Sequence, residues 1–448
     1  MATAGRADPE GPSSGSQGDA ESVPVKACPD TVQAWLEWQL SIHPKQIELG
    51  LARVDQVWRR LRSERLGCPV ITVAGTNGKG SCVAMLEAMA LAAGYSCGSY
   101  TSPHLVDYNE RVKRDGRPVS DATLCRAFER VEAAREHVAL TYFEFGTLAA
   151  LEIFAREEPD LLVLEVGLGG RLDAVNIIDP DVSVVTSIGR DHTAWLGDSL
   201  DAIAREKAGI FRAGRPAIIG QWDAPAALRG AAEERAAQPI QLGREIAIEP
   251  AESGWMLRGM GERRLALPLP AMRGRFQLDN AASAITALQC LAERLPISAA
   301  ALRKGLGRAL VPGRFQVVPG EVTWILDVAH NGEAARALAA NLEDFHCSGR
   351  VRAVLAVLAD KRPEAIVGPL RPWVGDWFLA QSDDARAMSV DALGQRLDPV
   401  LGEAIAGLYQ DVGSAIETAL AASRPGDCLL VVGSFTTVGQ GLRRLDGI

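Results

Sequence analysis

The chain has 448 residues, of which 47% are hydrophobic and 23% are charged, values that are ordinary for a globular protein of two or three domains. A formal net charge of -9 argues against a general nucleic-acid binder, although a local anion site remains compatible with it. No apolar run approaches the ~18 residues of a membrane span, so we expect no membrane contact.

The N-terminus and the cysteines indicate a cytoplasmic protein. Residues 1–27 are rich in Gly, Ser, Ala and acidic residues and lack a hydrophobic core, which predicts a disordered tail and not a signal peptide. The eight cysteines form no C-x-x-C pair, and most lie in apolar segments, where a reduced thiol acts as a small hydrophobe. Reduced thiols fit a reducing cytoplasm.

From Asp30 onward, apolar segments alternate with helical patterns, which predicts parallel sheets covered by helices on both faces. The strand candidates are 70–75, 160–166, 182–188, 216–220, 324–329, 351–358, 376–380 and 428–433. The helix candidates are 80–93, 121–137, 146–157, 199–211, 224–237, 281–294, 333–344 and 412–423.

We therefore expect an α/β protein with two domains. The alternation breaks at 240–275, where Pro and Gly interrupt short strands and loops, and a second series starts after Pro312–Gly313. Residues 28–311 are expected to form an N-terminal P-loop-type domain, a mostly parallel sheet with flanking helices. Residues 312–448 are expected to form a smaller C-terminal Rossmann-like α/β domain, with the active site between the two.

The segment Gly75–Ser81 carries the strongest functional signal. It follows the apolar strand Val70–Ala74 and precedes a good helix former. Its glycines can therefore turn backbone N–H groups onto an anion, while the helix N-terminus and Lys79 add positive charge. The spacing departs from G-x-x-x-x-G-K-[ST], because only two residues separate its first two glycines and a third glycine precedes Ser81. The pattern predicts a nucleoside triphosphate site; a tight turn without a ligand is the alternative.

Polar side chains follow several strands, at the edge where ligands bind in doubly wound sheets. Ser102 comes after a short strand, Glu165 ends another, and Asp191–His192 follow a third. Together with Ser81, these residues place hydroxyl, carboxylate and imidazole groups near the phosphate loop. Mg²⁺ prefers oxygen ligands. Imidazole is less typical, so a helix-capping or core histidine is an equal alternative for His192.

Two further segments have competing interpretations. Gly167–Leu172 suggests a dinucleotide fingerprint, but a leucine stands where the third glycine is needed, which argues against a dehydrogenase. In Asp327–Asn331, the Asp and His could contact nucleotide or a reacting carboxylate; alternatively, Asn331 caps the helix 333–344. Arg314 is either a charge at the domain hinge or an exposed linker residue.

Taken together, these motifs resemble the Mur ligase superfamily and, within it, the folylpolyglutamate synthase/dihydrofolate synthase family of the bifunctional bacterial type. The resemblance spans about residues 31 to 440, and the short phosphate loop is this family's own variant. The matching segments are Ile47–Val54, Gly75–Ser81, Ser102–Leu105, Thr141–Glu144, Leu164–Ala174, Asp191–Thr193, Arg205–Ile210, Pro312–Phe315 and Asp327–Asn331.

The resemblance implies ATP-binding, metal-binding and catalytic roles. Implied ATP contacts are Thr76, Asn77, Gly78, Lys79, Gly80, Ser81, Asn280, Arg314 and Asp327. Implied magnesium positions are Ser102, Glu165 and His192. Lys207 matches a lysine that the family carries as a carbamate, an anionic ligand for a second Mg²⁺; otherwise it is an ordinary helix lysine. The catalytic candidates are thus Lys79, His192 and Lys207.

The resemblance also implies where the organic substrates bind. Implied dihydropteroate contacts are Ile47, Glu48, Leu49, Gly50, Thr141, Tyr142, Phe143, Glu144, Leu172, Asp173 and Ala174. His330 is a candidate for the glutamate side of the site, in the C-terminal domain.

The implied reaction is ATP-dependent amide ligation. L-glutamate is added to dihydropteroate and to folate glutamates through an acyl phosphate, with ATP as co-substrate and two Mg²⁺ ions. We expect only small-molecule substrates as partners, and a monomer. A synthase that only extends glutamate chains and a cell-wall Mur ligase are the enzymatic alternatives. A P-loop switch that uses ATP to change shape is the alternative of another class.

Overall fold

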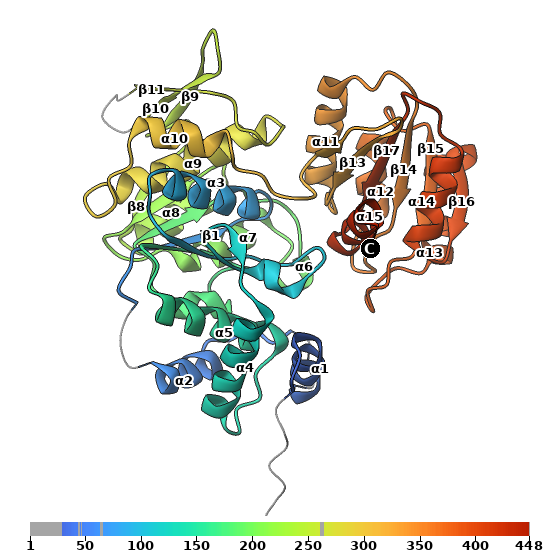
Figure 1. Ribbon diagram of the computed structural model, residues 1–448. Helices are drawn as coiled ribbons and strands as arrows, with labels where there is room; N and C mark the ends of the chain where they lie inside the picture. The colour runs from blue at the N-terminus through green and yellow to red at the C-terminus, as the bar shows by residue number, and fades with distance from the viewer. Residues whose placement is uncertain (1–28, 44, 46, 63–65, 260–263, 448) are drawn as a thin grey trace, which may run out of the picture.

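The computed structural model describes residues 29–447, except 44, 46, 63–65 and 260–263. The predicted disordered tail, residues 1–27, lies outside the described residues. Within them, the α/β class is confirmed: a large, mostly parallel sheet unit is followed by a smaller α/β unit (Figure 1). No helix of the described part is long and apolar enough to cross a membrane.

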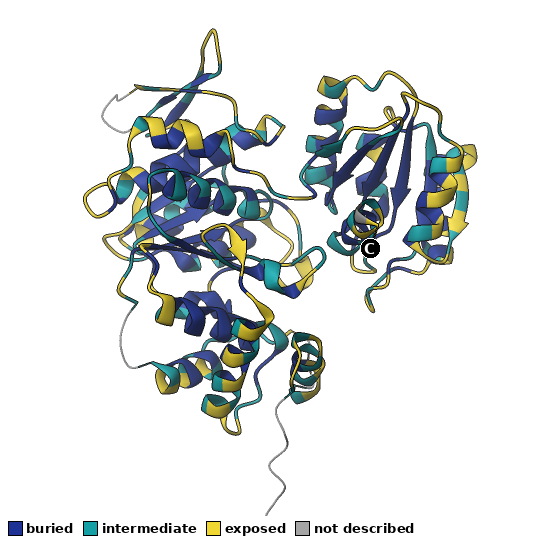
Figure 2. Cartoon of the chain, in the orientation of Figure 1, coloured by how far each residue is buried: buried dark blue, intermediate teal, exposed yellow. Residues whose placement is uncertain are grey.

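The larger unit contains an eight-stranded sheet with the order β4-β3-β2-β5-β1-β6-β7-β8. The pairings from β2 to β8 are parallel, and β3 and β4 add an antiparallel edge. The central strands are buried because helices cover both faces (Figure 2). The strands are β1 (Val70–Ala74), β2 (Cys97–Tyr100), β3 (Val112–Arg114), β4 (Arg117–Pro118), β5 (Leu161–Glu165), β6 (Val182–Val185), β7 (Pro216–Ile219) and β8 (Gln238–Gln241). Each edge strand contains a proline, Pro118 or Pro239.

Alternation along β1 assigns its side chains to two cores. Ile71 and Val73 pack in one cluster with helices α3, α9 and α10, and Val70 packs on the opposite face with α1, α2, α4 and α5. A further cluster on this second face includes α7 and α8. The helices are α1 (Val32–Ile42), α2 (Ala52–Leu61), α3 (Lys79–Ala92), α4 (Asp121–Arg135), α5 (Tyr142–Glu157), α7 (Leu200–Lys207), α8 (Ala226–Glu234), α9 (Phe276–Cys290) and α10 (Ala299–Leu306).

The break in the alternation at 240–275 is a small antiparallel sheet, as the interrupted pattern indicated. Its order is β11-β10-β9, and its apolar residues Trp255, Leu257 and Leu267 pack against the cluster of α3 and α9. The strands are β9 (Ala247–Pro250), β10 (Trp255–Arg258) and β11 (Arg264–Leu267).

The smaller unit is a six-stranded sheet with the order β12-β13-β17-β14-β15-β16, parallel except at β12. Helices α11, α12 and α13 pack on one face, and α14 and α15 on the other. The elements are β12 (Gln316–Val318), β13 (Thr323–Asp327), α11 (Gly332–Phe345), β14 (Val351–Leu355), α12 (Pro363–Leu370), β15 (Asp376–Ala380), α13 (Val390–Leu401), β16 (Ile405–Tyr409), α14 (Val412–Ala421), β17 (Cys428–Val432) and α15 (Phe435–Asp446).

Cys347 and Cys428 form a disulfide between the segment after α11 and the start of β17. The expectation of free thiols is therefore wrong for this pair, because the fold brings together two cysteines separated by 81 residues of sequence. The thiols of Cys68, Cys82, Cys97, Cys125 and Cys290 are free, as expected.

The helix that carries the phosphate loop depends on a close helix crossing. A Cβ atom at Gly305 of α10 would lie 2.4 Å from the Cα atom of Met89 in α3. Gly305→Ala should therefore push the helices apart and destabilise the fold by about 1–3 kcal/mol, measured by urea unfolding.

Gly307→Ala is the matched control. Gly307 has a φ of -73°, and the nearest atom to a Cβ there would be 3.6 Å away. The alanine should be neutral or stabilise the fold by ~0.4–1 kcal/mol. Equal losses in both variants would contradict a tight crossing at Gly305.

Candidate active site

The phosphate loop connects the buried end of β1 to the N-terminus of α3. Gly78 has a φ of 86°, a conformation that favours glycine, and a Cβ there would lie 2.5 Å from Oδ1 of Asn280. This close approach brings one implied nucleotide residue of α9 against the loop. Lys79 opens α3, and its Nζ donates to the carbonyl oxygens of Gly75 at 3.1 Å and Thr76 at 3.4 Å.

Side chains that follow β6 hold the loop from one side. The Asn77 N–H donates to Ser187 Oγ at 3.0 Å, and Thr186 Oγ1 donates to the Asn77 carbonyl at 2.6 Å. Thr76 Oγ1 accepts from the Gly189 N–H at 2.9 Å and donates to the Gly189 carbonyl at 3.1 Å. These bonds define the loop conformation.

Ser81 lies on the buried side of the loop. It is 1% exposed, and its Oγ accepts from Gln277 Nε2 at 3.3 Å. Gln277 Oε1 in turn accepts from Asn280 Nδ2 at 3.0 Å. Helix α9 therefore contacts the loop at both Gly78 and Ser81.

Glu165 at the end of β5 is a buried carboxylate beside this loop. Its Oε2 accepts from the Ser102 N–H at 3.2 Å. Burial raises the pKa of Glu165, while the charge of Lys79 and the Ser102 bond lower it. Among the described residues, no group of three His, Cys, Asp or Glu side chains could hold a metal. A magnesium ion bound by Glu165 would therefore need the Ser102 hydroxyl, phosphate oxygens and water, a donor set that suits this ion.

His192 has a left-handed backbone, with a φ of 51°, at the start of the short helix α6 (Thr193–Leu196). Its side chain is 42% exposed and lines the cavity of the phosphate loop. It makes no side-chain capping bond to α6. Its exposure excludes the core-histidine alternative, and its position at the cavity leaves it accessible to a ligand.

Lys207, the last residue of α7, is 5% exposed and points into the same cavity. Its Nζ donates to the Gly75 carbonyl at 2.9 Å. Burial, with the charge of Lys79, lowers the pKa of Lys207 to about 7. A large fraction of the amine is therefore neutral at neutral pH, which an ordinary exposed helix lysine would not be.

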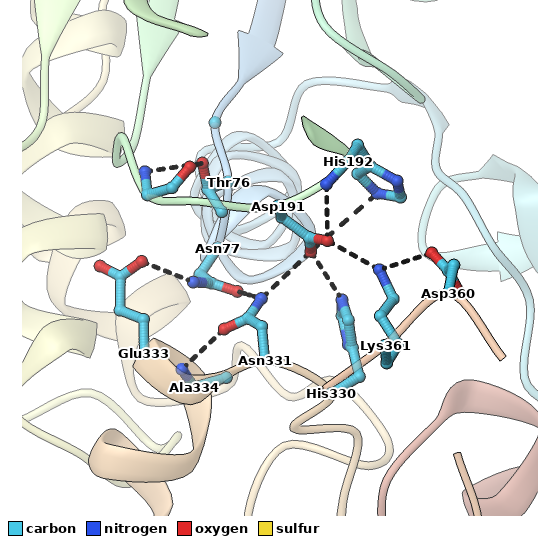
Figure 3. A network of polar contacts seen from close by, with 12 residues as sticks. Thr76, Asn77, Asp191, His192, His330, Asn331, Glu333, Ala334, Asp360 and Lys361 are labelled. Atoms are coloured by element: carbon cyan, nitrogen blue, oxygen red, sulfur yellow. Dashed lines mark hydrogen bonds and ion pairs between the residues drawn. The ribbon is translucent and has the colours of Figure 1, made fainter. Parts of the chain in front are cut away.

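Asp191 joins the two domains (Figure 3). Its carboxylate contacts Lys361 Nζ at 2.7 Å, Asn331 Nδ2 at 3.2 Å and His330 Nε2 at 3.3 Å, all three from the C-terminal part of the chain. Burial alone would raise the pKa of Asp191, but the hydrogen bond with His330 and the neighbouring positive charges hold it well below its usual range. Asn331 also caps α11 through a bond from the Ala334 N–H at 2.9 Å, as its alternative interpretation predicted.

Arg314 lies at the C-terminal side of the phosphate-loop cavity, whereas Asp327 lines neither this cavity nor its neighbour. Arg314 is half-buried, with its guanidinium carbon 5.3 Å from the ring centre of Phe435, and lines the phosphate-loop cavity. The structure therefore excludes the exposed-linker alternative. Asp327 accepts from the N–H groups of Phe315 and Ala329, each at 2.8 Å, so its carboxylate also fixes the local backbone.

A second cavity of about 1770 Å³ opens beside the first. Ten of the eleven implied dihydropteroate residues line it, and Gly50 bonds through its N–H to the Leu172 carbonyl at 3.3 Å. Lining residues shared by both cavities are Ser102, Pro103, Gly167, Leu168, Asp191, His192, His330 and Phe435. The phosphate loop therefore faces one end of a space large enough for a drug-sized ligand.

Two of the carboxylate side chains implied to contact dihydropteroate, those of Glu144 and Asp173, form hydrogen bonds within the protein. Glu144 forms a capping box with Thr141 and accepts from Arg53 Nη2 at 2.9 Å. Asp173 accepts from the N–H groups of Leu168 at 2.8 Å and Val175 at 3.0 Å, and burial raises its pKa to about 6. Both carboxylates shape the cavity wall, and their roles toward a substrate stay predictions.

The sequence pattern did not indicate Lys361 or Glu333 as site residues. It placed Asp191 near the phosphate loop but did not predict its contacts with the C-terminal domain. Lys361 follows the carboxyl end of β14, so the strand-end rule that selected Glu165 would also have selected this segment. Glu333 carried no signal, because its partner Asn77 is 256 residues away in the sequence.

Comparisons with known proteins define the class. Residues 73–288 match the Mur ligase middle domain, and residues 313–435 match the Mur ligase glutamate ligase domain. The fold and the phosphate-loop site are thus those of a Mur ligase, an ATP-dependent ligase.

The particular family follows from whole-chain relatives. The dihydrofolate synthase/folylpolyglutamate synthase of Escherichia coli K12 is 40% identical over 424 residues, covering 95% of this chain and 97% of that protein. The structure of E. coli FolC with DHPP and ADP superposes with a TM-score of 0.88 at 39% identity, covering 94% of this chain and 99% of that chain. Mycobacterium tuberculosis folylpolyglutamate synthase with ADP gives a TM-score of 0.81 at 29% identity, covering 93% and 98%. The chain belongs to the dihydrofolate synthase/folylpolyglutamate synthase family.

Asp191 and Asp360 both contact the Lys361 ammonium, but we expect the loss of Asp191 to destabilise the protein far more than the loss of Asp360. Asp191→Ala should leave the Lys361 ammonium, whose side chain is 8% exposed, without its partner at 2.7 Å and destabilise the protein by about 3–5 kcal/mol. Thermal unfolding would measure this, and small-angle scattering should show a larger radius of gyration as the domains separate.

Asp360→Ala is the control, because Asp360 contacts the same ammonium at 3.4 Å but is 58% exposed. Its loss should cost less than about 1 kcal/mol. Equal effects of the two substitutions would contradict a buried interdomain ion pair.

Proposed function

We propose that this chain adds L-glutamate to dihydropteroate and to folate glutamates, using ATP and divalent magnesium. One observation carries the proposal: the phosphate-loop cavity and the large cavity share a wall, so an acceptor carboxylate in the second can face the terminal phosphate in the first. Structures of related enzymes support it, since E. coli FolC is in complex with DHPP and ADP and another bifunctional family member has Mn, AMPPNP and L-glutamate bound.

The chemistry proceeds in two transfers. The acceptor carboxylate oxygen attacks the γ-phosphorus of ATP, ADP leaves, and an acyl phosphate forms. The neutral α-amine of glutamate then attacks the acyl carbon, the amide bond forms, and phosphate leaves with the C–O bond pair and takes up the proton that the nitrogen loses. Magnesium, held by Ser102, Glu165 and His192 in this proposal, would offset charge on the phosphoryl oxygens.

The residues of the chain supply positioning and charge. Lys79 and the loop N–H groups hold the triphosphate and offset the charge that develops on it. Asn280 lies at the nucleotide side, and Arg314 adds a C-terminal wall that limits water access to the acyl phosphate, while Asp327 fixes the backbone next to Arg314. His330, fixed by its bond to Asp191, is proposed to face the incoming glutamate.

The finer assignments are part of the same proposal. The domains divide at 311/312, the protein is a cytoplasmic monomer, and its partners are the small-molecule substrates. Tyr142 and Phe143 offer aromatic surface for a pterin in the large cavity. This surface favours a folate over the UDP-linked acceptor of a cell-wall Mur ligase.

The direct test supplies purified protein with ATP, Mg²⁺, L-glutamate and either dihydropteroate or a reduced folate. Mass spectrometry should find one added glutamate on dihydropteroate and extended chains on the folate. Products from the folate alone would indicate a synthase that only extends chains. ATP hydrolysis without any amide product would support the P-loop switch.

Lys79→Ala should lower turnover by ~10²–10³, because an ammonium that stabilises transferred charge is lost. The fold should be unchanged, since within the described residues the ammonium is hydrogen-bonded to the loop carbonyls of Gly75 and Thr76 and to no element outside the loop. Steady-state kinetics and circular dichroism would check both statements. A variant with a near wild-type rate would reject the assigned role.

Lys207 should make activity depend on carbon dioxide. The neutral amine attacks CO₂ and releases a proton, and a pKa of about 7 leaves more neutral amine at pH 8 than at pH 6. Activity in CO₂-depleted buffer should fall by about tenfold or more, and bicarbonate should restore it, more completely at pH 8.

Lys207→Arg should be inactive and should not respond to bicarbonate. Lys304→Arg, at an exposed lysine of α10, is the control and should behave as the wild type. A wild-type enzyme that is indifferent to CO₂ would exclude the carbamate.

A further inference from the structure

Glu333 lies in the first turn of α11 and reaches the phosphate loop of the other domain (Figure 3). Its Oε2 accepts from Asn77 Nδ2 at 3.0 Å. The carboxylate lies against the backbone of Gly189, because a Cβ there would be 2.1 Å from the same oxygen, and it also lines the large cavity. Burial raises the pKa of Glu333, while the Asn77 bond and the charge of Arg336 lower it. The carboxylate therefore occupies a defined position against the loop.

Two residues at the N-terminus of α11 form hydrogen bonds with the side-chain amide of Asn77, one with its nitrogen and one with its oxygen. Its Nδ2 donates to Glu333, and its Oδ1 accepts from Asn331 Nδ2 at 3.1 Å. An amide has one donor end and one acceptor end, so two such partners permit a single orientation. The backbone of Asn77 is fixed separately by Thr186 and Ser187. The C-terminal domain thus determines where this one loop side chain points.

We propose that Glu333 is a positioning residue for ATP: it orients the Asn77 amide, so that the placement of the C-terminal domain sets the geometry of the phosphate loop. The proposal rests on the proposed function, in which Asn77 contacts the ATP phosphates. It adds a specific link between domain arrangement and nucleotide affinity.

Charge and hydrogen bonding at Glu333 have opposite effects on nucleotide binding. A carboxylate next to a triphosphate site repels the ligand, whereas its bond to Asn77 orients a group that holds the ligand. If charge dominates, any neutral substitution tightens binding. If positioning dominates, only a side chain that still accepts from Asn77 preserves binding.

Two substitutions separate these effects. Glu333→Ala removes the acceptor and should raise the Kd of ADP, by calorimetry, and the KM of ATP by about tenfold, corresponding to about 1.4 kcal/mol. The kcat should change by less than about twofold, because the interaction is made in ground and transition states alike. Glu333→Gln keeps an acceptor oxygen and removes the charge, so its ADP affinity should equal or exceed that of the wild type.

Glu343→Ala is the matched control, at an exposed glutamate of the same helix for which the described residues offer no partner. It should leave both constants unchanged. Gly189→Ala provides an independent variant, because the new methyl group must displace the Glu333 carboxylate while the charge remains. It should weaken ADP binding at least as much as Glu333→Ala.

A double-mutant cycle tests the link itself. Once Asn77→Ala has removed the amide, Glu333→Ala should no longer weaken ADP binding. Independent, additive effects would overturn the proposal, as would ADP binding by Glu333→Ala that equals or exceeds the wild type. ADP binding by the wild type without amide products would instead contradict the proposed function and leave the positioning role to be judged by calorimetry.

Discussion

Two ammonium groups converge on one carbonyl oxygen at the centre of this structure. Lys79 Nζ lies 3.1 Å and Lys207 Nζ 2.9 Å from the oxygen of Gly75. Burial, reinforced by repulsion from the charge of Lys79, lowers the pKa of Lys207 and makes its neutral form more accessible. The nearby Glu165 carboxylate is the acidic group of the loop site, and burial raises its pKa. An anionic ligand and the proposed carbamate would each reduce the same excess of positive charge.

The parallel sheets explain why these groups meet. The carboxyl ends of β1, β5 and β6 lie side by side, and each is followed by polar residues: the phosphate loop, Glu165 itself, and the segment that reaches Asp191. The second sheet presents its own strand ends, after β13 and β14, to the same place. Both domains therefore contribute segments to the site. The hydrogen bonds of Asp191 form only when Lys361 and Asn331 of the other domain are in place.

The sequence was most informative for features that depend on residues close together in the chain. Continuous apolar strands predicted the parallel sheets, and the glycines before Lys79 predicted the phosphate loop. It was less informative at β16, a half-exposed edge strand, and at α12 and α13, which contain Pro369 and Pro399. The capping box of Thr141 and Glu144 could have been found from its spacing, and would have indicated a structural use for that carboxylate. The Asp191–Lys361 and Asn77–Glu333 contacts span 170 and 256 residues of sequence, and only the folded arrangement of the domains creates them.

The prolines in the two outermost strands of the large sheet have a consequence beyond the single molecule. Neither Pro118 of β4 nor Pro239 of β8 has an N–H group to donate, and β4 is a two-residue strand that also bears an exposed arginine. A strand from a neighbouring chain could not form a continuous series of backbone hydrogen bonds with either edge strand of the sheet. A long, apolar and mostly parallel sheet is thereby protected against edge-to-edge aggregation while its interior stays rich in β-branched residues.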